Sequence, residues 1–100
     1  MTKHFTWYEP EDWTPREQCP CCGYVTLPER HTSLICQVCF WEDDCFIGNK
    51  LDEPSVCNHM TLREARDNFA RIGACEEAML KNVVPPEERA KYTWLPFESQ

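Results

Sequence analysis

The feature that most constrains the fold of this chain is a doubled cysteine pair. Cys19 and Cys22 form one CxxC motif, and Cys36 and Cys39 form another, in a stretch ending at Asp44 that holds five of the eight cysteines. Four thiols with this spacing are typical of a tetrahedral zinc site. A chain of 100 residues buries only a modest share of its surface, so a metal is a common supplement to its core. The sequence therefore predicts one structural Zn²⁺; iron would fit the same spacing.

The residues around the two motifs indicate a zinc ribbon. The first motif ends in Gly23, which can adopt a positive φ and lets the chain pass close to the metal. Two β-prone runs, 24–27 and 32–35, flank the segment that begins at Pro28. We expect these runs to pair as an antiparallel hairpin that carries the first knuckle into the second.

Downstream, the pattern changes to that of a helix. Thr61 and Glu64 are spaced as a capping box, and apolar residues then recur at helical intervals up to Ile72. Gly73 stands where a helix would stop. This predicts a main helix from Leu62 to Ile72, whose apolar face covers the ribbon.

We expect a single α+β domain over residues 1–100, with the main helix followed by short C-terminal helices. Its aromatic-rich ends should pack on the zinc module: Phe5, Trp7, Tyr8 and Trp13 at the start, and residues 92–97 at the end. The segments are an aromatic arm (1–18), the metal knuckles and hairpin (19–44), an acidic loop (45–60), the main helix (61–73) and a helical and aromatic tail (74–100).

The charge of the chain restricts its partners. The formal net charge is −7, and four thiolates around one Zn²⁺ would make it about −9. Such a surface repels phosphate backbones, so nucleic-acid binding is disfavoured and a basic protein partner fits better. An acidic contact surface would comprise Glu42, Asp43, Asp44, Asp52 and Glu53; the alternative is a solvated acidic loop. There is no membrane-length apolar run and no secretory signal, which favours the cytoplasm and reduced thiols.

The other cysteines leave a second metal or redox site open and offer no active site. Cys45, Cys57, His59 and Cys75 are candidates for a Cys₃His centre, but their spacing does not enforce one, and separate thiols are the alternative. Cys21, inside the first motif, should turn away from the metal. The histidines are scattered, and a four-cysteine site has no open position for water, so we expect no enzyme activity.

At CPCCGY, ICQVCFWEDD and LREARDNFARIGA the chain resembles the CPCC family of small cysteine-rich bacterial proteins, over roughly Cys19 to Pro86. This resemblance supports the metal site and a bacterial cytosol. Small acidic proteins of this kind look similar to immunity proteins, so we expect a non-catalytic protein-binding module that neutralises a basic, possibly nuclease, toxin. The alternatives are a rubredoxin-like electron carrier and a zinc-ribbon regulator that binds nucleic acid.

Overall fold

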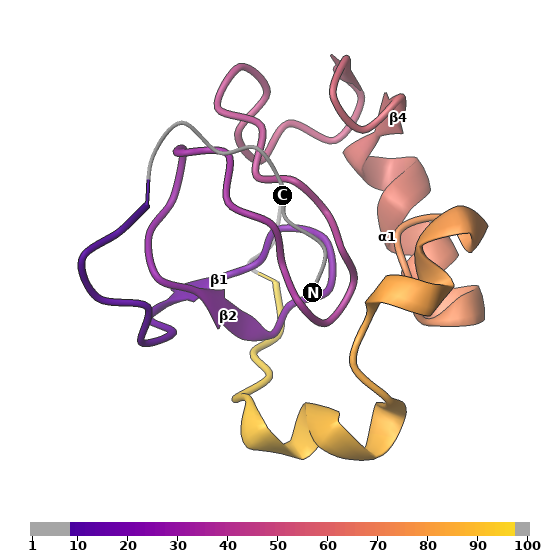
Figure 1. Ribbon diagram of the computed structural model, residues 1–100. Helices are drawn as coiled ribbons and strands as arrows, with labels where there is room; N and C mark the ends of the chain where they lie inside the picture. Colours follow the sequence, from indigo (N-terminus) through magenta and orange to yellow (C-terminus); the bar gives the residue numbers. More distant parts are fainter. Residues whose placement is uncertain (1–8, 98–100) are drawn as a thin grey trace.

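Short strands and one main helix surround the cysteine-rich centre of the protein (Figure 1). The computed structural model describes residues 9–97. The elements, in chain order, are β1 (Glu17–Gln18), β2 (Val25–Leu27), β3 (Pro54–Ser55), β4 (Met60–Thr61), α1 (Leu62–Ile72) and the 3₁₀ helices η1 (Glu77–Asn82) and η2 (Pro86–Lys91). This confirms the predicted α+β class with one main helix and short C-terminal helices.

Helix α1 begins and ends as its sequence predicts. The Thr61 hydroxyl accepts a hydrogen bond from the backbone N–H of Glu64 (3.1 Å), and the Glu64 carboxylate accepts one from the backbone N–H of Thr61 (2.9 Å). Gly73 ends the helix in the left-handed conformation (φ 89°) and donates its N–H to Phe69 (2.9 Å). The buried side chains of Leu62 and Ala65 face the core, so the helix packs on the cysteine module through its apolar stripe.

The pairing of the strands differs from the predicted hairpin. Strand β2 pairs antiparallel with β1, which precedes the first knuckle, rather than with residues 32–35. Ile35 instead forms a β-bridge with Glu42, across the second knuckle. The reason is that each CxxC turn itself reverses the chain, so the residues on its two sides meet each other.

The C-terminal tail adds an extended segment beside β2. The backbone N–H of Val25 donates to Thr93 (2.7 Å), and the N–H of Leu95 donates to Gly23 (3.0 Å). Trp94 forms a β-bridge with Tyr24 between these two bonds. The predicted docking of the aromatic tail is therefore confirmed, and we call residues 93–97 the strap.

The N-terminal aromatic arm is only partly covered by the described residues. Trp13 is 56% exposed, so the prediction that it packs into the zinc module is wrong for this ring. The other three rings of the predicted arm, Phe5, Trp7 and Tyr8, lie outside the described residues.

The stretch predicted as an acidic loop contains a small hairpin of its own. Strands β3 and β4 pair antiparallel, with Pro54 opposite Thr61 and Ser55 opposite Met60. Strand β4 runs directly into α1, so this hairpin is connected to the start of the main helix. Within residues 9–97, no helix has the length and apolar character needed to cross a membrane.

Candidate metal centre

The first knuckle is a tight turn held by backbone hydrogen bonds. The N–H of Cys19 donates to the carbonyl of Tyr24 (2.8 Å), and the N–H of Gly23 donates back to Cys19 (3.1 Å). Inside the turn, the N–H of Cys21 donates to the sulfur of Cys19 (3.4 Å). Gly23 has φ 89°, which is the left-handed conformation that its position in the turn requires. The turn therefore aims backbone dipoles at a sulfur ligand.

The second knuckle repeats the first, bond for bond. The N–H of Cys36 donates to Trp41 (3.0 Å), and the N–H of Phe40 donates to Cys36 (2.8 Å). The N–H of Val38 donates to the sulfur of Cys36 (3.3 Å). Phe40 takes the place of the glycine and also has a positive φ (70°), with its ring packed against the core. The two CxxC motifs are thus a structural repeat as well as a sequence repeat.

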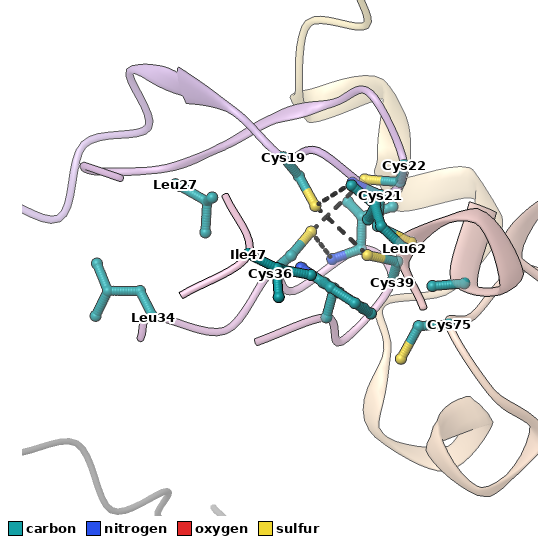
Figure 2. Packing of buried hydrophobic residues seen from close by; sticks show 13 residues of the cluster. Cys19, Cys21, Cys22, Leu27, Leu34, Cys36, Cys39, Ile47, Leu62 and Cys75 are labelled. Atoms are coloured by element: carbon teal, nitrogen blue, oxygen red, sulfur yellow. Dashed lines mark hydrogen bonds between the residues drawn. The ribbon is translucent and has the colours of Figure 1, made fainter. Parts of the chain in front are cut away.

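The four predicted ligands meet at one point. Their sulfur atoms all lie within 4.8 Å of one another, with 3.6 Å between Cys19 and Cys39 and 3.6 Å between Cys22 and Cys36. A tetrahedron with metal–sulfur bonds of about 2.3 Å would place its sulfurs about 3.8 Å apart. Figure 2 shows the four side chains pointing toward one another in the interior, where each is at most 3% exposed. The residues therefore fit a single four-coordinate metal ion.

The surroundings of the thiols indicate that a cation belongs among them. Burial raises the pKa of Cys19 and of Cys39 far above the ordinary thiol value, because a thiolate in the interior loses its hydration. Burial also opposes ionisation of Cys36, but hydrogen bonds from neighbouring thiols and from the Thr26 hydroxyl (3.0 Å) outweigh it and lower its pKa. A divalent cation would stabilise all four thiolates and remove this conflict.

The half-buried side chain of Arg66 lies beside the first knuckle, a position that the sequence pattern does not predict. Its Nε donates to the carbonyl of Pro20 (2.8 Å), and its guanidinium carbon lies 3.6 Å from the centre of the Phe97 ring. Burial lowers the pKa of Arg66, while the nearby thiols of Cys21 and Cys19 raise it. Its helical position gives no sequence signal for this contact, which depends on how α1 packs.

The structure corrects the predicted acidic surface at Asp43. This side chain is fully buried and accepts two hydrogen bonds from Arg30, at 3.0 Å from Nε and 3.1 Å from Nη2. It also accepts the backbone N–H of His31 (2.6 Å). The Asp43 carboxylate therefore links the 28–33 loop to the segment that follows the second knuckle. Because it is buried, it is not available to contact a partner.

Asp44 is also an internal residue. One of its oxygens accepts the hydroxyl of Ser55 (2.8 Å) and the other accepts the N–H of Phe46 (2.9 Å). Of the five predicted contact residues, Asp52 and Glu53 are exposed, and Asp52 pairs with Arg63 (2.7 Å). Burial of the Asp43 and Asp44 carboxylates shows that the prediction of a contact role is wrong for both.

The remaining cysteines do not assemble into a second centre. Among residues 9–97, the four knuckle cysteines form the only group of three or more potential metal ligands whose ligand atoms lie close together. Cys21 is buried in the core, at the position that Val38 occupies in the other knuckle, and is not turned outward. Burial is the main cause that raises the pKa of Cys57 to about 11 and of Cys75 to about 12, so both remain thiols at neutral pH.

The fold and the site together define a class: a small α+β protein in which two CxxC knuckles enclose one closed four-cysteine site whose geometry fits a metal ion. Residues 17–90 match the family model described as cysteine-rich CPCC. The chain therefore belongs to the cysteine-rich CPCC family, and the match ends before the strap. No curated protein and no solved structure matches the chain.

Proposed function

We propose that the protein is a non-catalytic protein-binding module whose four knuckle cysteines hold one structural zinc ion. In its most concrete form it is a bacterial immunity protein that neutralises a basic toxin, such as a nuclease, in the cytoplasm. The proposal that the protein is non-catalytic is supported by the closed set of four buried thiols. These thiols fill the coordination of a tetrahedral metal ion and leave no position for water or substrate.

The charge supports a basic partner. The formal net charge is −7, and most carboxylates stand on the outside. The exposed acidic residues are Glu9, Glu11, Asp12, Glu17, Asp52, Glu53, Glu64, Asp67, Glu77, Glu87 and Glu88. An acidic surface of this kind attracts a cationic protein over a distance and accelerates its association.

The test uses the product of a toxin gene that neighbours the gene for this chain. Stopped-flow mixing of the two purified proteins should give an association rate that falls on the order of tenfold when salt is raised from low to physiological strength and beyond. An association rate that does not depend on salt would contradict the proposed electrostatic attraction between the two proteins. A neighbouring product that is acidic, or that does not bind, would contradict the immunity role.

A rubredoxin-like electron carrier is the second candidate. It is favoured by the backbone N–H groups of Cys21 and Val38, which donate to ligand sulfurs, because such bonds tune the potential of iron centres. Elemental analysis of aerobically purified protein separates the two: a red protein with iron supports the carrier, and a colourless protein with one zinc removes it. The third alternative, a nucleic-acid-binding regulator, is opposed by the charge and would need a gel shift at physiological salt.

A further inference from the structure

Two apolar side chains stand out from the surface of the protein. Phe46 is 87% exposed and Val56 is 85% exposed, whereas the other large exposed apolar residues within 9–97 range from 42% to 56%. The fold gains almost nothing from either side chain, since neither is removed from water. Burying both against a partner would supply a few kcal/mol of hydrophobic free energy.

The buried carboxylate of Asp44 holds the two side chains in neighbouring loops. One oxygen accepts the N–H of Phe46 and the other accepts the hydroxyl of Ser55, the residue directly before Val56. The Ser55 oxygen also accepts a hydrogen bond from the side chain of Asn58 (2.9 Å). Phe46 and Val56 are therefore carried on backbone whose position is fixed by interior hydrogen bonds, which lowers the entropy lost on binding.

Both loops lie at the top of the view in Figure 1, and the second of them joins β3 to β4. Asp52 and Glu53 are exposed, and they directly precede β3, the first strand of the hairpin that leads to Val56. Of the five carboxylates between residues 42 and 59, Asp52 and Glu53 are the exposed ones, and Asp52 pairs with Arg63. An apolar centre with an acidic rim has the anatomy of a protein interface.

We propose that Phe46 and Val56 are the apolar anchors of the docking surface for a basic protein, with Asp52 and Glu53 at its rim. This inference rests on the proposed protein-binding function and locates its surface. The occupant is a basic protein rather than a second copy, because two copies that each carry a net charge of −7 would repel each other.

The experiment places a photo-cross-linking residue, p-benzoylphenylalanine, at position 46, 56 or 80 of the full chain in the native host. Position 80 is the control, since Leu80 is also an exposed apolar residue but belongs to η1. We expect irradiation to give an adduct at positions 46 and 56, absent at position 80, with a partner that mass spectrometry identifies as a basic protein. Phe46→Ala should then weaken binding of that purified partner on the order of 30-fold.

The other outcomes are distinguishable. An adduct at position 80 alone would overturn the inferred surface and leave the protein-binding function standing, whereas no adduct at any position would overturn both. An adduct with a second copy, or with an acidic protein, would overturn the basic occupant. Unchanged affinity of Phe46→Ala would also refute the anchor role. Because Phe46 is almost fully exposed, this variant should keep the wild-type melting temperature and metal content, which shows that it is folded.

Discussion

The contact between the strap and the first knuckle predicts that Gly23→Ala is strongly destabilising. A Cβ atom at Gly23 would lie 2.7 Å from Nε1 of Trp94 and 3.1 Å from the carbonyl oxygen of Leu95, and the backbone there has φ 89°. The left-handed conformation costs an alanine about 1–2 kcal/mol. The added methyl group also pushes the strap away from the knuckle.

Displacing the strap removes two hydrogen bonds at this point. The indole of Trp94 donates to the carbonyl of Cys22 (3.1 Å), and the N–H of Leu95 donates to Gly23 (3.0 Å). At about 1 kcal/mol each, their loss brings the total cost of Gly23→Ala to about 3–4 kcal/mol. For a chain of this length, 1 kcal/mol shifts Tm by roughly 4–8 °C, so Tm should fall by roughly 12 °C or more.

The assay is thermal unfolding of the metal-loaded protein, with Trp94→Ala as the matched background. Without the indole, the closest clash is absent, so Gly23→Ala should cost about 1–2 kcal/mol there, from the backbone conformation alone. Equal costs in the two backgrounds would show that the strap does not press on the knuckle. A Tm within about 1 °C of wild type would refute the whole argument.

Three further predictions concern the interior and the thiols. Removal of the metal with a strong chelator should abolish cooperative unfolding, since a structural zinc ion contributes on the order of 10 kcal/mol in small domains; a sharp transition in metal-free protein, seen by circular dichroism, would contradict the structural role. Asp43→Asn should lower the free energy of unfolding by about 3–5 kcal/mol in urea titrations, because it leaves the Arg30 guanidinium without its buried counter-charge; a loss below 1 kcal/mol would show that Arg30 finds another partner. Alkylation of Cys57, followed by peptide mass spectrometry, should accelerate about tenfold per pH unit up to about pH 11, and a plateau near pH 9 would exclude the raised pKa.

Two carboxylates of the Glu42–Asp44 run stabilise the interior of the protein and do not contribute to its surface charge. In the sequence, Asp43 and Asp44 look like solvent-exposed carboxylates of the Glu42–Asp44 run that follows Trp41. In the structure they are interior acceptors, one for Arg30 and one for Ser55. The exposed side chains nearby include the apolar Phe46 and Val56 as well as Asp52 and Glu53, so recognition of a partner at this end would combine an apolar centre with charge at its rim.

Much of the architecture could be predicted from local patterns. The ligand set follows from the spacing of four cysteines, because a CxxC turn places two thiols on one metal whatever surrounds it. The bounds of α1 follow from the capping box at Thr61 and from Gly73, because these hydrogen bonds join residues three or four apart. These contacts join residues close together in the sequence, so the local sequence alone is enough to predict them.

Contacts between distant segments were decided by the tertiary structure alone. The sequence pattern offered residues 32–35 as the partner of β2, whereas closure of the first knuckle brings β1 (Glu17–Gln18) beside it. Asp43 became an interior residue because the 28–33 loop brings Arg30 to it, and the strap covers Gly23 from 72 residues further along the chain, as the Trp94 to Cys22 bond shows. The sequence by itself determined the four ligands and the main helix. Which strands pair and which carboxylates are buried depend on packing between distant residues, and single-sequence patterns do not record that packing.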